Sequence, residues 1–208
     1  MISCKGKSRE ASTAQPDPKL DGYITAFTSK LGSLGKIKST LATTPALTKD
    51  DLPTLEKGRF TLIAAEQLDL LGNCFSNAKV CDNDWWLLSH CDGYAKLSRE
   101  KLADDPTAPF VLKNCAELHY LVVARQTAFK APVLAMETKT YEHGTLSADL
   151  FVFDIDTAKY LGGFKASSST PDKLEGMERN SGRIETWLLE LIGIGLNQAT
   201  EKKFGFQK

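Results

Sequence analysis

The large apolar residues near the start of the chain repeat with the period of an α-helix. Asp17-Pro18 is a typical helix start, because a capping carboxylate precedes a proline whose missing N–H is no loss in the first turn. From there apolar residues recur every three or four positions, at Leu20, Tyr23, Ile24, Phe27, Leu31 and Leu34. The pattern predicts an amphipathic helix that ends near Gly35.

The middle of the chain carries the patterns of buried β-strands. Residues 118–124 are apolar at almost every position, which is typical of a central strand covered on both faces. A second such strand follows, with Leu146, Ala148, Leu150 and Val152 on one face and Phe151, Phe153 and Ile155 on the other. Residues 156–159 then turn the chain into a strand over 160–166, which completes a hairpin. We expect three antiparallel strands, with 59–64 and 85–89 as further candidates.

The end of the chain returns to a helical pattern. After a polar bridge at 167–170, one apolar side predicts a helix from about Arg183 to Glu201, formed by Ile184, Trp187, Leu188, Leu191 and Ile192. Helices at both ends and strands in the middle predict an α+β fold, with N-terminal and C-terminal helices packed on a largely antiparallel sheet. A chain of 208 residues with 42% hydrophobic content suffices for one core, so 18–208 should form a single domain.

Charge and hydropathy exclude two classes of function. The chain has 26 basic and 26 acidic residues, so it lacks the positive field that holds a nucleic-acid backbone. The longest apolar run, Trp187 to Leu196, is interrupted by Glu190, Gly193 and Gly195, and is shorter than the roughly 20 residues of a membrane-spanning helix. We therefore expect neither a nucleic-acid partner nor a chain that crosses a bilayer.

Four of the five cysteines lie close together in the middle of the chain, which is typical of disulfides in an oxidising compartment. We expect Cys74 to pair with Cys81 across a short turn, and Cys91 to pair with Cys115, although four cysteines allow three pairings. Zinc binding with His90 is an alternative, but the chain lacks the close Cys-x2-4-Cys spacing of structural zinc sites. A second alternative keeps all four thiols free and buried in a reducing cytosol.

The fifth cysteine, Cys4, lies in a polar segment that reads CKGKSREASTAQPDP as far as Pro18. This composition predicts that residues 1–17 form a flexible tether. The residues Met1-Ile2-Ser3-Cys4 resemble the end of the signal of exported bacterial lipoproteins, where a small residue precedes the cysteine that receives the lipid. The resemblance implies lipidation of Cys4, with the rest of the signal upstream of Met1, and Lys5 implies sorting to the outer membrane. The alternative is an incidental exposed cysteine.

Two adjacent tryptophans, Trp85 and Trp86, are candidate binding residues. If they lie on a strand, one faces the core and the other is exposed beside acidic residues, where it could stack on a sugar or a peptide. The alternative interpretation is that both cover the end of the core next to a disulfide.

No motif for catalysis, metal binding or a cofactor is present. The three histidines, His90, His119 and His143, lie in no spacing that supports a catalytic dyad, and there is no Gly-x-Ser-x-Gly elbow. We expect His119 to be a hydrogen-bonded core residue and His143 to lie in a turn. Asp149, Asp154 and Asp156 could bind calcium, but a strand edge and a turn cap explain them equally well.

These patterns lead to one functional hypothesis and two alternatives. The first is a noncatalytic lipoprotein domain on the periplasmic face of the outer membrane, which binds an envelope protein or a cell-wall component through the face that bears the cysteine loops. The first alternative is an exported hydrolase whose active-site residues are too scattered to recognise. The second is a cytoplasmic interaction domain with free thiols.

Overall fold

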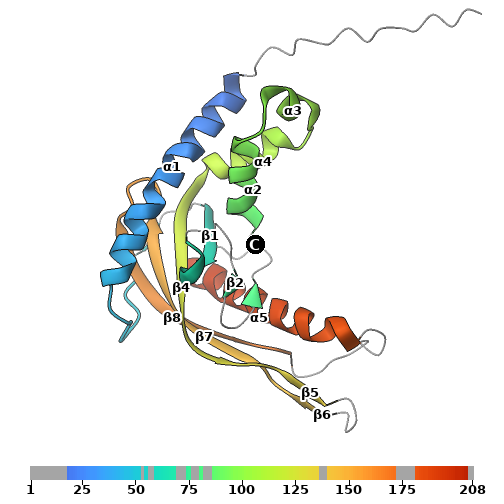
Figure 1. Cartoon of the computed structure of the whole chain (residues 1–208). Coiled ribbons are helices and arrows are strands. Elements are labelled where there is room, and N and C mark those ends of the chain that lie inside the picture. The colour runs from blue at the N-terminus through green and yellow to red at the C-terminus, as the bar shows by residue number, and fades with distance from the viewer. Residues whose placement is uncertain are drawn as a thin grey trace, which may run out of the picture.

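A computed structural model of the chain describes residues 18–52, 54–55, 59–68, 74–75, 80–81, 86–135, 140–171 and 181–205 (Figure 1). The helices are α1 (Pro18–Thr43), α2 (Trp86–Ala95), α3 (Arg99–Asp104), α4 (Ala108–Ala116) and α5 (Ser181–Phe204), with a short 3-10 helix, η1, at Ala65–Gln67. The strands are β1 (Arg59–Ala64), β2 (Cys74–Phe75), β3 (Val80–Cys81), β4 (Leu118–Lys130), β5 (Val133–Ala135), β6 (Thr140–Glu142), β7 (Thr145–Asp154) and β8 (Tyr160–Ser169). The predicted α+β fold is confirmed.

The main sheet has four strands in the order β1-β4-β7-β8. Strand β7 pairs antiparallel with β4 on one side and with β8 on the other, as predicted, whereas β1 runs parallel to β4 at one edge. Strand β8 forms the other edge. Beyond the far end of β4 and β7, the short β5–β6 pair continues the same curved ribbon (Figure 1).

A hydrophobic core lies on each face of this sheet, because the central strands alternate their side chains between two helical layers. On the side of α1, which we call the α1 face, the core includes Leu121, Val123, Phe151, Phe153 and Ile155, packed against Phe27 and Ile37 of α1 and against α2 and α4. On the opposite side, the α5 face, it includes Val122, Leu146, Leu150 and Val152, packed against Ile192 and Leu196 of α5. The predicted division of β7 between two buried faces is confirmed.

Helix α1 is longer than the sequence predicted, because it continues past Gly35 to Thr43. Ile37 and Leu41 extend its buried stripe for two further turns. A glycine inside a helix costs about 1 kcal/mol relative to alanine, and the additional buried side chains offset that cost.

The candidate strand at 85–89 is wrong, because Trp86 begins helix α2. Helices α2, α3 and α4 pack against the N-terminal half and the middle of α1 at one end of the molecule (Figure 1). Leu20 of α1 contributes to a small core there with Leu102, Ala108 and Leu112. Burial against α1 therefore decides the conformation of this segment.

The end of the chain differs from the prediction in one respect and agrees with it in another. The predicted polar bridge at 167–170 is mostly strand, because β8 continues to Ser169 opposite β7. The predicted C-terminal helix is confirmed, with Ile184, Leu188 and Ile192 buried. Among the residues that the structure describes, no helix is long and apolar enough to cross a membrane.

Candidate functional site

The α1 face of the sheet changes from apolar to polar where α1 ends. Along β7, the side chains on this face are Phe153 and Phe151 beneath α1, followed by Asp149 and Ser147 beyond it. The helix stops at Thr43, and the segment after it covers Asp149 but leaves Ser147 half-buried and Thr127 and Ser167 exposed. The polar residues thus occupy the part of this face that no helix covers.

Two polar rows cross the strands in this uncovered part. Asp149 lies between Arg125 of β4 and Lys165 of β8 in the register of the sheet, so a carboxylate is flanked by two cations. In the next row, Ser147 of β7 lies opposite Ser167 of β8. The regular pairing of β4 with β7 shifts in this region, between Gln126 and Ala128.

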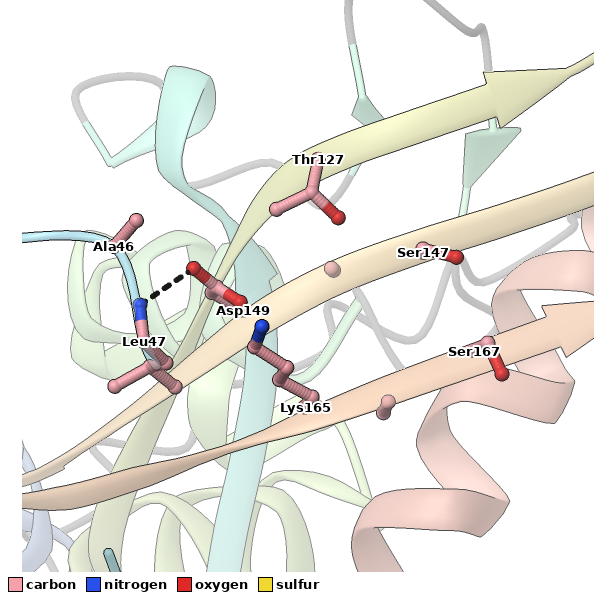
Figure 2. A pocket seen from close by; sticks show the side chains of 9 residues that line it. Ala46, Leu47, Thr127, Ser147, Asp149, Lys165 and Ser167 are labelled. Carbon is pink, nitrogen blue, oxygen red and sulfur yellow. Dashed lines mark hydrogen bonds between the residues drawn. The ribbon is translucent and has the colours of Figure 1, made fainter. Parts of the chain in front are cut away.

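Asp149, Lys165, Ser147 and Ser167 line a hollow of about 460 Å³, together with Ala46 and Leu47 from the segment after α1 (Figure 2). Asp149 is 2% exposed, and its Oδ2 accepts a hydrogen bond from the backbone N–H of Leu47 at 2.9 Å. Thr127, Ser147 and Ser167 bring one hydroxyl from each of three strands. We refer to this hollow as the Asp149 pocket.

Arg125 holds the end of α1 beside the Asp149 pocket. Its guanidinium donates to the carbonyl oxygens of Leu41 at 2.6 Å and Thr44 at 3.0 Å. It also lies 4.6 Å from the centre of the Phe151 ring. A helix end leaves its last carbonyls without partners inside the helix, and a cation there is favourable. Arg125 therefore connects α1 to β4 and positions the segment that forms one wall of the pocket.

The same segment continues along the edge of β8. Asp50 accepts hydrogen bonds from Lys203 Nζ at 2.5 Å and from the backbone N–H of Lys165 at 3.0 Å, and these lower the pKa of its carboxyl below 3.8. Burial, together with the charges of Asp51 and Asp149, raises the pKa of Tyr160 above its usual value of 10.0.

The pocket is suited to hold a polar group by hydrogen bonds. Its lining offers three hydroxyls, the carboxylate of Asp149 and the ammonium of Lys165, and it includes neither a histidine nor a cysteine. Asp149 already bonds to Leu47, which fixes its orientation. This mixture of an acceptor, a donor and hydroxyls favours a polar ligand group.

One of the two predicted disulfides is present in the structure. Cys91 of α2 and Cys115 of α4 form a disulfide, with Cα atoms 5.7 Å apart, and both residues are fully buried. Cys74 and Cys81 lie directly opposite each other in the β2–β3 pair, which suits the predicted bond. Their side chains are outside the described part of the structure, so that bond stays a prediction.

The lipidation and tryptophan hypotheses also remain predictions. Cys4 and Trp85 lie outside the described residues, and Trp86 is described only as the first residue of α2. The position of Trp86 on a helix removes the argument that adjacent tryptophans alternate between two faces of a strand.

The histidines lie apart from the Asp149 pocket. His119, expected in the core, is exposed as the second residue of β4, although its neighbours Leu118 and Tyr120 are both buried. His90 is exposed on α2. His143 lies between β6 and β7, as predicted, with Nδ1 3.3 Å from the carbonyl oxygen of Thr170.

The three aspartates considered for calcium have separate roles. Asp154 accepts from the N–H and the hydroxyl of Thr157 in the β7–β8 turn, and Asp156 pairs with Lys30 of α1. Asp149 lies in the pocket. Across the described residues, no group of three or more His, Cys, Asp or Glu side chains is placed to hold a metal ion.

The Asp149 pocket was not predicted, although the sequence holds a signal for it. The alternation that places Phe151 and Phe153 on one face continues backwards to Asp149 and Ser147. A carboxylate on an otherwise apolar face of a buried strand indicates either a specific partner or a site.

Comparisons with known proteins add no functional information. No protein-family model and no curated protein matches the chain. One solved structure that aligns is a hypothetical protein, CT253, from Chlamydia trachomatis. The identity is 15%, the alignment covers 51% of this chain and 63% of that chain, and the TM-score is 0.24. A likeness this weak supports no argument about either fold or function.

Proposed function

We propose that this protein is a noncatalytic binding domain of the bacterial cell envelope, tethered to the periplasmic face of the outer membrane through a lipid on Cys4. Its partner is an envelope protein or a cell-wall component.

The observation that carries this proposal is the buried bond between Cys91 and Cys115. Disulfides between structural cysteines persist in exported proteins and are rare in the cytosol, where thiols are kept reduced. The bond joins two helices that pack on α1, so it stabilises the fold. An oxidising compartment is the environment that suits it.

The position of the pocket suits a tethered binding domain. Cys4 lies 14 positions before Pro18, where α1 begins, whereas the pocket includes Ala46 and Leu47, just after α1 ends. A helix of 26 residues is about 39 Å long, so it separates the two ends by that distance. A lipid on Cys4 would hold the α3 end nearer the membrane and leave the Asp149 pocket free to meet a partner.

This arrangement revises which surface does the binding. The sequence favoured the face with the cysteine loops, but the disulfide of α2 and α4 lies in the core beneath α1. The Asp149 pocket is open and polar, with hydrogen-bonding groups from three strands and no histidine or cysteine in its lining. Such a lining favours binding over acyl transfer or hydrolysis.

The test of the tether is chemical analysis of the protein from the cells that make it. Mass spectrometry should find an acylated Cys4 in the membrane fraction, and Cys4→Ala should move the protein to the soluble fraction without changing its melting temperature. Thiol titration after unfolding, without reductant, should find the central four cysteines oxidised. An unmodified Cys4 would contradict the proposed lipid anchor. Four free central thiols would contradict the proposed location in an oxidising compartment.

A further inference from the structure

Strand β8 forms one edge of the main sheet, and it pairs with β7 along its inner side. In an antiparallel edge strand, the N–H and C=O of every second residue point away from the neighbouring strand. Gly163 shows which residues these are, because its N–H and C=O both bond outward to Asp51, at 2.8 and 2.7 Å. Lys165, Ser167 and Ser169 therefore also direct their backbone groups outward.

The first part of this edge is already covered by the segment after α1. Asp51 forms an antiparallel bridge with Gly163, and the side chain of Asp50 accepts from the N–H of Lys165. Lys203 of α5 fixes Asp50 in that position. The chain itself thus shows that the outer side of β8 accepts an extended segment in antiparallel register.

Among the described residues, none covers the second part of the edge, from Ala166 to Ser169. Ser167 and Ser169 are exposed, and within the described residues their outward backbone groups have no hydrogen-bond partner. Proteins usually protect such an edge with a charge, a proline or a bulge, and residues 166–169 contain neither a charge nor a proline. This uncovered stretch is a template for another strand.

The Asp149 pocket lies directly beside this stretch, because Lys165, Ala166 and Ser167 line it. A strand added at Ser167 and Ser169 would point alternate side chains toward the α1 face and bring one of them over the pocket. Recognition of extended peptides combines backbone hydrogen bonds along an edge with pockets for alternate side chains. Both parts are present here.

We propose that the Ala166–Ser169 edge binds an extended segment of a partner protein as an added strand, with a long polar side chain in the Asp149 pocket. The inference rests on the proposed binding function and names the class of partner. The polar requirement follows from the lining, which offers the carboxylate of Asp149 as an acceptor, the ammonium of Lys165 as a donor and three hydroxyls that can do both.

A partner peptide fits this edge better than a second copy of the chain. Over residues 166–169, β8 itself offers only alanine and serine, and no such side chain fills a hollow of about 460 Å³. Because the adjacent Gly163 and Lys165 are already bonded to Asp51 and Asp50, a second copy that pairs through its own β8 edge would also have only these four residues to offer.

The test uses a phage-displayed library of random peptides, selected on the full chain. The selected peptides are synthesised, and their affinity is measured by fluorescence polarisation for the wild type, Ser167→Pro and Ser167→Ala. Proline removes the outward N–H but is tolerated on an edge strand, whereas alanine keeps the N–H and removes only the hydroxyl. We expect Ser167→Pro to lose about 10-fold or more in affinity, and Ser167→Ala to lose less than about 3-fold.

A second measurement leaves the protein unchanged. N-methylation of successive peptide amides should weaken binding at alternate positions only, which is the signature of an added strand. This readout also decides the question if Ser167→Pro does not fold.

Three outcomes would overturn the proposal. One is that no peptide is enriched, and another is that the peptides bind Ser167→Pro as well as the wild type. The third is a dimer, seen by sedimentation, that Ser167→Pro dissociates, because the edge would then be paired with itself. Each outcome is independent of Cys4 acylation and of the number of free thiols. An experiment that contradicts strand addition at this edge therefore leaves the proposed lipid tether untouched, and the reverse also holds.

Discussion

The side-chain amine of Lys30 lies 2.6 Å from Oδ1 of Asp156, which joins the middle of α1 to the turn between β7 and β8. The lysine side chain is only 6% exposed, whereas that of the aspartate is 50% exposed. A buried ammonium depends on its partner, because its loss of hydration is otherwise uncompensated. This pair therefore adds a polar contact between α1 and the sheet to the hydrophobic packing of Phe27 and Ile37.

Asp156→Asn should lower the free energy of unfolding by about 1–2 kcal/mol, because it leaves the buried ammonium of Lys30 without a counter-charge. Lys30→Met added to that variant should recover most of the loss, since the buried charge is then gone. Urea unfolding of the two variants measures both effects. Asp104→Asn on α3 is the control, expected within about 0.5 kcal/mol of the wild type. Equal stability of Asp156→Asn and the control would contradict this account.

The bond between Cys91 and Cys115 should contribute roughly 3 kcal/mol to stability. It closes a loop with a sequence separation of 24 residues, and the chain-entropy model predicts a contribution of that order. The double variant Cys91→Ala/Cys115→Ala should show this loss in urea unfolding without reductant. Retention of wild-type stability would mean that the bond does not form in the folded protein.

The two buried faces of the sheet were predictable because a buried strand can be recognised from the pattern of neighbouring residues in the sequence. In β7, side chains alternate between two layers, and almost every position is apolar, so a period of two identifies both cores. The same logic identified α1 and α5 from their apolar stripes.

The helices of the disulfide-bonded region were not predictable in the same way. Trp86 to Ala95 has little periodicity, and it forms a helix because Leu88 and Cys91 pack beneath α1 and α4. The predicted end of α1 near Gly35 was also wrong. Burial of Ile37 and Leu41 in the tertiary structure extends the helix, and a glycine such as Gly35 is only a weak signal for a helix end. Long-range packing decides both cases, and single-sequence patterns do not contain it.

The candidate site could be predicted only in part. Asp149 and Ser147 follow from the alternation of β7, but the hollow depends on where α1 ends and on the hydrogen bond from Leu47. The open edge depends on β8 being outermost in the sheet, which the strand order decides. Neither feature is local in sequence.

Gly163→Ala should destabilise the protein by about 1–3 kcal/mol. A Cβ at this position would lie 2.6 Å from the carbonyl oxygen of Leu150 and 2.9 Å from Leu47 Cδ1, so the segment that covers β8 must move. Hydrogen exchange should show faster exchange of the Asp51 amide, which bonds to Gly163. The matched control is Gly35→Ala, because nothing lies within 4 Å of a Cβ there and the change should stabilise the helix by up to about 1 kcal/mol. Destabilisation by both changes to the same extent would contradict the packing argument.

Stability should fall as the pH drops below about 4, through the lowered pKa values of three aspartates. Hydrogen bonds from Tyr94 and Thr107 lower the pKa of Asp105 below 3.8. Burial raises the pKa of Asp154, but hydrogen bonds from the N–H and hydroxyl of Thr157 outweigh that effect, and the net pKa is also below 3.8. The pKa of Asp50 is lowered as well, mainly by the hydrogen bond from Lys203.

The direction follows from linkage. A carboxyl whose pKa is lower in the folded state stabilises that state above its unfolded pKa, and the contribution is lost as the pH falls through the folded value. Urea midpoints measured from pH 6 to pH 2 should therefore decline, and conversion of Asp50, Asp105 and Asp154 to asparagine should reduce the slope. An unchanged slope in the triple variant would show that other carboxylates control acid unfolding.

Arg125→Met should loosen the end of α1 and the wall of the Asp149 pocket together. The arginine donates to the carbonyls of Leu41 and Thr44 and lies over the Phe151 ring, so its removal leaves both carbonyls without that donor. Hydrogen bonds from a charged group are worth about 1.5–3 kcal/mol, and a loss within this range is expected in urea unfolding.

Lys130→Met is the matched control for this change. Lys130 also lies on β4, but it is exposed and pairs with the exposed Glu142, and such surface pairs contribute about 0–1 kcal/mol. The distinguishing measurement is hydrogen exchange at Leu47, whose amide bonds to Asp149. Its protection should fall in Arg125→Met and stay unchanged in Lys130→Met. If protection at Leu47 is retained in both variants, Arg125 does not position the pocket wall, and the Asp149 hydrogen bond alone holds it.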